Sequence, residues 1–293
     1  MFKRTVLVVL LLVVLTVGCQ TAEPETVEVP VEVEVTRIVE VPVEQSAPES
    51  PPINPMLPIE FDTIESSATG REYTLTVVLP LSYGMSDANY PVLYVTDGDF
   101  YAIPLGMAAG QLAFGQELPE VITVGIDYGN PNPMEWLELR ELDMGPEGSE
   151  QFLQFFEEEL IPYIESTYRA DPANRTLAGH SSGGNFALYA LLNAADTFGN
   201  FIASSPGAAA GLIDAVENFA ANQDETAAKL YLSVGDLDTE VVAGVQAFDD
   251  ALVEMDFDGL VHEMMVLDNE THLSARPRAF NNGMRWLFAG EGE

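Results

Sequence analysis

The stretch Gly179-His180-Ser181-Ser182-Gly183 reads G-x-S-x-G and decides the fold of this 293-residue chain. It follows a short apolar run at residues 175–178 that can form a buried strand, and it precedes residues 184–192, which are rich in helix formers. A strand, a tight glycine-bounded turn and a helix make a nucleophile elbow, which lifts a serine hydroxyl out of a sheet. A structural Gly/Ser turn is the alternative. The flanking strand and helix favour the catalytic interpretation of Ser181.

The pattern on both sides of this turn predicts alternating strands and helices. Apolar runs predict strands at residues 73–79, 91–96, 121–126, 201–204, 229–234 and 261–267. Helical periodicity covers residues 149–168, 240–255 and 277–288, and Pro162 should kink or divide the first of these helices. This alternation predicts an α/β fold with a mostly parallel sheet and helices on both faces.

The N-terminus has the layout of a bacterial lipoprotein signal peptide. Lys3-Arg4 is basic, residues 6–17 are almost wholly apolar, and Gly18-Cys19 offers a small residue before a cysteine. The apolar run is too short for a comfortable membrane span. We therefore expect residues 1–18 to be removed and Cys19 to carry a lipid, although Thr16 stands where leucine is commoner. The expected location is the bacterial cell envelope, lipid-anchored at the membrane surface. Simple secretion and an uncleaved anchor are the alternatives.

Residues 19–55 are predicted to form an acidic spacer. The segment Val27-Glu28-Val29-Pro30-Val31-Glu32 recurs as Val39-Glu40-Val41-Pro42-Val43-Glu44. Repeated prolines and like charges oppose strand pairing and favour an extended chain. The remaining residues, 56–293, are enough for one α/β domain with a full core.

Charge and composition exclude several classes of partner. The chain has 47 acidic and 11 basic residues, for a formal net charge of -36. Such a field repels nucleic acids and other polyanions. The sequence contains no dinucleotide-binding fingerprint, phosphate loop or metal-ligand cluster, so we expect neither a cofactor nor a metal. Cys19 is the only cysteine, which excludes an intrachain disulfide. The oligomeric state is left open.

A serine nucleophile needs a base, and the chain has three histidines. His180 is adjacent to Ser181 on a sharp turn, where neighbouring side chains diverge. His262 lies in a predicted strand and is more naturally structural. His272 follows the last predicted strand, at the edge where the sites of open α/β sheets cluster. Elimination and placement therefore select His272.

The acid of such a site is expected between the serine and the histidine. The predicted strand at residues 229–234 ends at Gly235, and Asp236, Asp238 and Glu240 follow it. Glu240 can instead favour the N-terminus of the next helix. Spacing alone leaves Asp236 and Asp238 as equal candidates for the group that holds the imidazole.

An oxyanion hole needs two donors. The first is expected from the backbone N–H of Ser182, directly after the nucleophile. The second should come from the loop after an early strand, where Asp97-Gly98-Asp99-Phe100 follows an apolar run. The N–H of Asp99 or of Phe100 is the natural candidate, and an ordinary turn is the alternative.

These motifs together resemble the putative-esterase family of α/β-hydrolases over about residues 59–288. The resemblance lies in residues 90–99, in the G-H-S-x-G-G elbow at 179–184, in the strand end at 232–238 and in Glu270-Thr271-His272-Leu273-Ser274. The branch that it most resembles contains the siderophore esterases of the enterobactin and salmochelin type. Feruloyl esterases, S-formylglutathione hydrolases and mycolyltransferases are more distant relatives.

The resemblance implies an α/β-hydrolase fold with Ser181 as nucleophile, Asp238 as acid and His272 as base. It implies cleavage of a small-molecule carboxylic ester through an acyl-enzyme. An envelope acyltransferase with the same triad and a non-catalytic binding protein on this scaffold are the alternatives. The resemblance also draws attention to Arg140, which either binds an anionic group of the substrate or fastens its loop to Asp143; the second role is favoured.

Overall fold

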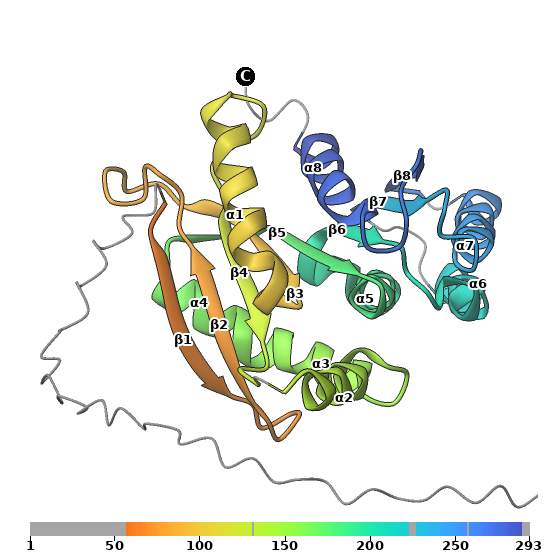
Figure 1. Ribbon diagram of the computed structural model, residues 1–293, viewed down its shortest axis with the longest axis horizontal. Coiled ribbons are helices and arrows are strands. Elements are labelled where there is room, and N and C mark those ends of the chain that lie inside the picture. The colour runs from red at the N-terminus through yellow and green to blue at the C-terminus, as the bar shows by residue number, and fades with distance from the viewer. Residues whose placement is uncertain (1–56, 131, 223–226, 257, 289–293) are drawn as a thin grey trace, which may run out of the picture. The chain divides into compact units, whose positions relative to one another are not determined.

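The described strands form one eight-stranded sheet. The structure, a computed structural model, describes residues 57–130, 132–222, 227–256 and 258–288, all within one unit, Ile53–Glu293. Within these residues the strand order is β1-β2-β4-β3-β5-β6-β7-β8 (Figure 1). The strands are β1 (Ile59–Glu65), β2 (Glu72–Val78), β3 (Tyr90–Thr96), β4 (Ile122–Asp127), β5 (Ala170–His180), β6 (Gly199–Ser204), β7 (Ala228–Gly235) and β8 (Leu260–Leu267).

The sheet is mostly parallel. Strand β2 pairs antiparallel with β1 and with β4, and every pair from β4 across to β8 is parallel. Parallel neighbours need crossover connections, and these are the helices that cover both faces of the sheet. The predicted α/β-hydrolase fold is confirmed.

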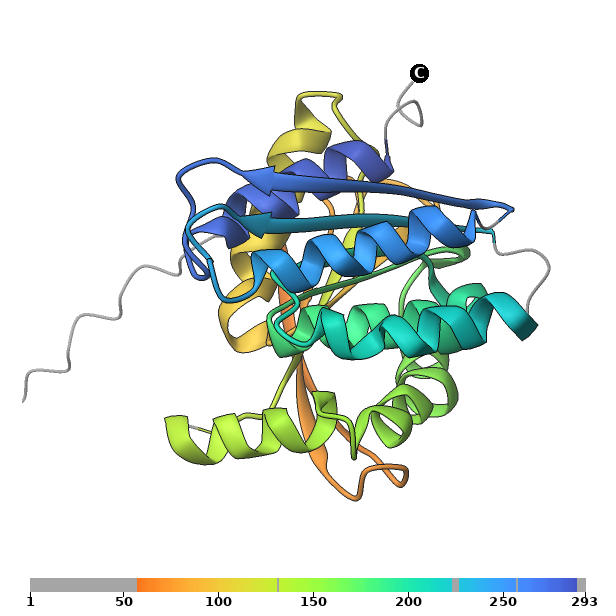
Figure 2. The same cartoon turned by 90° about the vertical axis from the view of Figure 1, so that its right-hand side faces the viewer.

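The helices divide between the two faces. The described helices are α1 (Gly98–Phe114), α2 (Pro133–Met144), α3 (Ser149–Phe155), α4 (Ile161–Thr167), α5 (Ser182–Phe198), α6 (Ile213–Asn222), α7 (Val242–Met255) and α8 (Ala275–Leu287). Helices α1 and α8 pack on one face, and α3 to α7 pack on the other. Figure 2 views the β8 edge, with α6 and α7 on one side of the strands and α8 on the other.

Strand side chains alternate between two apolar cores, as the period of two requires. On β3, Val92 and Tyr94 contribute to the core beneath α3 to α7, whereas Leu93 and Val95 contribute to the core beneath α1 and α8. All four are at most 1% exposed. Both faces of the central strands are therefore buried, which explains why they read as continuous apolar runs.

The long helix predicted at residues 149–168 is interrupted. A π-helical segment, Phe156–Leu160, separates α3 from α4. Pro162 then occupies the first turn of α4, directly after this π-helical segment. The expectation that Pro162 marks a join is confirmed.

Helix α1 was not predicted from the sequence, because its buried side is made largely of small residues. Gly98, Ala102, Gly106 and Ala109 are buried there, and Pro104 lies inside the helix. A side chain at Gly106 would overlap Val78 of β2, so this helix packs very close to the sheet. Such small-residue contacts leave a weak hydrophobic pattern.

The carboxyl ends of the parallel strands gather the polar loops at one edge of the sheet. Val95 of β3 pairs with Ala178 of β5, and Gly235 of β7 pairs with Leu267 of β8. The loops that follow these strands carry Asp97, Ser181, Asp238 and His272. The fold therefore brings residues that are far apart in the sequence to one place.

The predicted signal peptide, the lipidation site Cys19 and the acidic spacer lie outside the described residues. Among the described helices, none combines the length and the apolar composition that crossing a bilayer requires.

Candidate active site

Ser181 lies in a strained turn between β5 and α5. Its φ and ψ angles are 58° and −120°, a conformation that non-glycine residues rarely adopt. The N–H of Ser181 donates to the carbonyl of Ser204 at 2.9 Å, and the N–H of Asn185 donates to the carbonyl of Ser181 at 2.9 Å. The neighbouring strand and the new helix thus hold the serine in this conformation.

The two glycines of the motif are needed because the backbone packs tightly around Ser181. A side chain on Gly179 would overlap the backbone of Gly183 across the turn. A side chain on Gly183 would overlap the hydroxyl of Thr96 at the end of β3. The G-x-S-x-G spacing therefore permits the close approach of α5 to β5 and β3, which a Cβ would prevent.

His272 contacts Asp238 in the loops that follow β8 and β7. The His272 Nδ1 atom lies 2.6 Å from Asp238 Oδ2. Asp236 has a different partner, because its Oδ1 atom accepts a hydrogen bond from the N–H of Glu270 at 3.2 Å. The N–H of Leu237 also donates to the carbonyl of Glu270 at 3.0 Å. Asp236 thus helps to tie the two loops together, while Asp238 holds the imidazole.

Ser181 and His272 line the same pocket, whose volume is about 270 Å³. The contact of His272 Nδ1 with Asp238 leaves its other ring nitrogen, Nε2, for a different partner. The rest of the pocket wall mixes buried polar groups with apolar and aromatic side chains. The lining residues are Asp97, Phe100, Tyr101, Trp136, Arg140, His180, Ser181, His272, Leu273 and Arg276.

Arg140 joins the loop after β3 to the elbow. Its Nε atom donates to Asp97 Oδ1 at 2.6 Å, and its Nη2 atom donates to Asp97 Oδ2 and to the carbonyl of His180, both at 3.0 Å. Its Nη1 atom lies 3.1 Å from a carboxylate oxygen of Glu141. Arg140 lines the pocket, but each of its nitrogens already contacts a protein acceptor. We conclude that it braces the site.

The expected contact between Arg140 and Asp143 is wrong. Asp143 is fully buried, forms an ion pair with Arg71, and accepts a hydrogen bond from the hydroxyl of Tyr73 at 2.8 Å. Arg71 directly precedes β2, and Tyr73 lies near the start of this strand. Strands β4 and β3 separate β2 from β5, the strand that leads into the elbow. Sequence proximity favoured Asp143 as the partner of Arg140, but the packing of α2 turns the two side chains to different neighbours.

His180 is buried beside His272 and stays neutral. Burial lowers the pKa of His180 to about 3, and the nearby His272 and Arg140 add to this effect. Its Nδ1 atom lies 3.0 Å from Ser204 Oγ, and its ring centre is 4.7 Å from that of His272. His262 instead contacts Asp249, at 3.2 Å. Of the three histidines, only His272 lines the pocket and also contacts a carboxylate.

The two expected donors after β3 differ in the structure. The N–H of Phe100 donates to the carbonyl of Asp97 at 3.0 Å, so this group is engaged and the expectation for Phe100 is corrected. Asp99 lies in the first turn of α1, where backbone N–H groups have no partner within the helix. Its carboxylate accepts a hydrogen bond from Trp136 Nε1 at 2.8 Å. The N–H of Asp99 remains the candidate on this loop.

Ser182 begins α5, and its side chain contacts α2. Its hydroxyl donates to Glu141 at 2.7 Å. Ser182 also lines another cavity, of about 400 Å³, together with Met144, Tyr189 and Leu212. The small side chain of Ser182 therefore shapes this second cavity, while the position of its N–H at the start of α5 is that of the first expected donor.

Asp127 is a buried carboxyl group that the sequence did not single out. It ends β4 beneath the start of α1, and its Oδ2 atom accepts a hydrogen bond from Thr76 at 2.8 Å. Burial raises the pKa of Asp127 to about 7, and the charges of Asp99 and Asp97 contribute. The only signal in the sequence is an acidic residue directly after an apolar strand.

No group of three or more His, Cys, Asp or Glu side chains within the described ranges is arranged to hold a metal ion. The site is therefore described by its protein groups alone.

Comparison with known proteins identifies a family. Residues 66–251 match the family model described as Putative esterase. The chain is 31% identical over 170 residues to the ferri-bacillibactin esterase BesA of Bacillus subtilis (strain 168), in a match that covers 50% of this chain and 57% of BesA. The chain thus spans little more than half the length of the curated relatives that it matches.

Solved structures share the fold over most of the described chain. The BES protein from Bacillus cereus superposes with a TM-score of 0.70 and 27% identity, covering 78% of this chain and 94% of that one. The siderophore hydrolase EstA from Aspergillus nidulans superposes with a TM-score of 0.73 and 18% identity, covering 81% of this chain and 97% of that one. At 18% identity the second likeness concerns the fold alone.

Proposed function

The chain belongs to the Putative esterase family of α/β-hydrolases, and we propose that it hydrolyses a small-molecule carboxylic ester with Ser181, His272 and Asp238 as a catalytic triad. The observation that carries this proposal is the 2.6 Å contact between His272 and Asp238, with His272 lining the same pocket as the strained Ser181. Asp238 orients the imidazole and stabilises its protonated form.

The proposed reaction has two steps, acylation of Ser181 and hydrolysis of the acyl-enzyme. Ser181 Oγ attacks the ester carbonyl carbon while His272 Nε2 accepts the hydroxyl proton. The bond to the alcohol oxygen then breaks, and the alcohol leaves with that proton. Water adds to the acyl-enzyme by the same route, with His272 again accepting a proton, and the carboxylic acid leaves as Ser181 is restored.

The oxyanion is stabilised by two backbone donors at helix N-termini. These are the N–H of Ser182 at the start of α5 and the N–H of Asp99 at the start of α1. The positive ends of both helix dipoles favour negative charge there. Loss of one such donor typically costs about 3 kcal/mol of transition-state stabilisation.

The named relatives indicate which esters to test, and the net charge of the chain indicates which of these esters it favours. BesA is named as a ferri-bacillibactin esterase and EstA as a siderophore hydrolase, so a siderophore-type ester belongs in the first test panel. The net charge of -36 opposes the approach of multiply charged anions. We therefore expect an iron-free or weakly charged ester to be cleaved faster than a highly anionic ferric complex.

A fluorophosphonate probe tests the nucleophile. We expect the probe to label the wild-type protein and to leave Ser181→Ala unlabelled, because only an activated serine reacts with it. Hydrolysis of 4-nitrophenyl butyrate should disappear in the same variant. Equal labelling of the two proteins would overturn the proposal.

The two aspartates after β7 provide a matched test of the acid. Asp238→Asn should lower kcat by about 10⁴, the effect of this substitution at a triad acid, because the wrong imidazole tautomer is then favoured. Asp236→Asn removes the same charge two residues away but leaves the contact with His272 intact. Similar losses in kcat for the two variants would contradict the assignment of Asp238.

We also propose that the protein is exported and anchored through a lipid on Cys19, on the basis of the N-terminal sequence pattern. Radiolabelled palmitate should enter the wild-type chain in a bacterial host and should not enter Cys19→Ala. Absence of label from the wild-type chain would overturn this location.

A further inference from the structure

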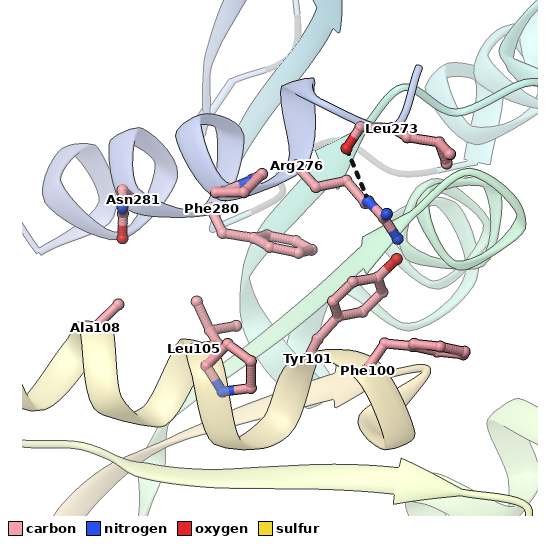
Figure 3. A pocket seen from close by; sticks show the side chains of 10 residues that line it. Phe100, Tyr101, Leu105, Ala108, Leu273, Arg276, Phe280 and Asn281 are labelled. Atoms are coloured by element: carbon pink, nitrogen blue, oxygen red, sulfur yellow. Dashed lines mark hydrogen bonds between the residues drawn. The ribbon is translucent and has the colours of Figure 1, made fainter. Parts of the chain in front are cut away.

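A further cavity, the α1/α8 cavity, opens between α1 and α8 beside the catalytic pocket, the pocket that Ser181 and His272 line (Figure 3). Its volume is about 260 Å³. It shares Phe100, Tyr101, Leu273 and Arg276 with the catalytic pocket, so the two spaces adjoin. The remaining lining residues are Pro104, Leu105, Ala108, Pro277, Phe280 and Asn281.

The walls of this α1/α8 cavity are largely apolar. Tyr101 and Phe280 contact each other edge to face in its wall, with ring centres 5.7 Å apart. Figure 3 shows Leu105 on the floor formed by α1 and Phe280 on the side of α8. A cavity of about 150 Å³ is enough to hold benzene. The α1/α8 cavity can therefore hold one aromatic ring with a short chain.

Arg276 is the one charged side chain that lines this cavity, and it stands where the cavity meets the catalytic pocket. Its Nε atom donates to the carbonyl of Leu273 at 3.0 Å, and its guanidinium carbon lies 4.9 Å from the centre of the Tyr101 ring. These contacts fix the plane of the guanidinium group. They use only one of its three nitrogens as a hydrogen-bond donor.

The partners of Arg276 differ from those of most other arginines. Within the described residues, Arg71, Arg140, Arg175, Arg278 and Arg285 each form an ion pair with an aspartate or glutamate, whereas Arg276 has none. Asp97 is the acidic group whose field reaches it, and Asp97 is already held by Arg140. Arg169 also has no ion pair within the described part of the chain, but two of its nitrogens donate to the backbone carbonyls of Tyr83 and Ala88, whereas Arg276 donates to one carbonyl only.

We propose that the α1/α8 cavity is the subsite for an apolar arm of the ester, and that Arg276 selects arms that carry a single negative charge close to the scissile bond. This inference rests on the proposed function, because it places the arm next to Ser181. The guanidinium group would donate to a carboxylate-like group at the entrance of the cavity, and the hydrocarbon part would lie in the cavity against Tyr101, Leu105 and Phe280.

The charge of the whole chain limits the selection to one negative charge. The net charge of -36 repels anions at long range, with a strength that grows with the charge of the ligand. Arg276 acts only at contact distance, where a partly desolvated ion pair is much less screened by salt. A singly charged, mainly apolar arm meets both conditions.

Binding to an inactive variant tests the subsite independently of turnover. The full chain carrying Ser181→Ala is titrated by calorimetry with 3-phenylpropionate and with its neutral isostere 3-phenylpropanamide. We expect the carboxylate to bind at least about tenfold more tightly than the amide, because a hydrogen bond to a charged group is worth this much. Equal affinities, or no binding of either compound, would overturn the proposal.

Further substitutions in the same background assign the effect to its residues. Arg276→Gln should reduce the preference for the carboxylate to less than about twofold. Arg285→Gln removes the same charge from the last turn of α8, where Arg285 contacts Glu117 at 2.6 Å, and should keep the preference. Ala108→Phe should fill the cavity and weaken both compounds equally. A preference that survives Arg276→Gln would show that the anion binds elsewhere.

The two proposals fail in distinguishable ways. If Ser181→Ala binds 3-phenylpropionate no more tightly than the amide, while the probe labels the wild-type protein normally, the subsite proposal is overturned and the esterase proposal stands. If the carboxylate binds at Arg276 but the fluorophosphonate probe never labels the wild-type protein, the esterase proposal is overturned and the binding site at Arg276 remains. Circular dichroism melts of every variant check that each remains folded.

Discussion

The pocket that contains Ser181 and His272 has two unlike walls. The braced wall consists of Asp97, Arg140 and His180, which are 2%, 7% and 2% exposed and are joined by hydrogen bonds through Arg140. The open wall includes Phe100 and Leu273, which are 57% and 62% exposed, together with Arg276. The difference teaches that this site separates fixed groups from exposed ones. The polar groups of the braced wall are fixed by burial and hydrogen bonds, whereas Phe100 and Leu273 on the open wall are largely exposed to solvent.

The physical cause of this separation is the cost of burying charge. Asp97 and Arg140 are both removed from water, and each is tolerable only because the other satisfies it. Such a pair holds one geometry, since any displacement leaves an unpaired buried charge. The exposed side chains of the open wall lose little when they move. Substitutions on the two walls should therefore have effects of very different size.

Breaking the braced wall should produce the largest effect on stability. Arg140→Gln leaves the carboxylate of Asp97 buried without its partner, which should lower the free energy of unfolding by about 3–5 kcal/mol. Urea denaturation followed by circular dichroism measures this loss. Arg285→Gln, which removes an exposed arginine, should change stability by less than about 1 kcal/mol. Equal losses in the two variants would show that Arg140 is not a brace.

The carboxyl group beneath the braced wall should make stability depend on pH. The pKa of Asp127 in the folded protein is raised to about 7, above its value in the unfolded chain. Between about pH 4 and about pH 7 the folded state therefore holds a proton that the unfolded state has lost. The free energy of unfolding falls as pH rises through this window, by on the order of 2–4 kcal/mol for this group.

Asp127→Asn isolates this contribution, because the amide cannot ionise. Urea denaturation at about pH 5 and about pH 8 should show a smaller loss of stability on the alkaline side in Asp127→Asn than in the wild-type protein. The remaining carboxyl groups are common to both proteins and cancel in the comparison. An identical pH dependence in the two proteins would contradict the raised pKa of Asp127.

The smallest effect on stability is expected on the open wall. Phe100→Ala removes a side chain that is 57% exposed, so the free energy of unfolding should change by less than about 0.5 kcal/mol. The KM values of esters with aromatic arms should rise, because Phe100 lines both the catalytic pocket and the α1/α8 cavity. Steady-state kinetics with aromatic and short alkyl esters separates the two groups. A stability loss as large as that of Arg140→Gln would remove the distinction between the walls.

Two local features of the site could be predicted from the sequence because they depend on neighbours along the chain. The elbow around Ser181 requires glycines at fixed spacing between a strand and a helix, and this pattern is visible in the letters alone. His272 could be selected because only three histidines exist, and only this one follows a strand end. Most strands were also found, since each carries its own apolar run.

Contacts between distant segments could not be predicted. Asp236 and Asp238 are equivalent by spacing, and only the family resemblance favoured Asp238. The packing of the β7 and β8 loops places Asp238 against the imidazole and Asp236 against the backbone of Glu270. Arg140 of α2 pairs with Asp97, which directly follows β3, although Asp143 lies one helical turn away. The N–H of Phe100 is engaged because its segment begins a helix, where a loop was expected.

The sequence by itself indicated the glycine-bounded turn at Ser181, the candidate base His272 and the mostly parallel sheet, because short-range periodicity and steric limits act on adjacent residues. The family resemblance favoured Asp238 over Asp236, and the tertiary structure shows the contact between Asp238 and His272. The tertiary structure alone decided which acid the buried Arg140 contacts and which arginine lines the α1/α8 cavity without an acidic partner. These choices follow from the order in which strands align and from the cost of leaving a buried charge unpaired. Both act between residues that the chain separates widely.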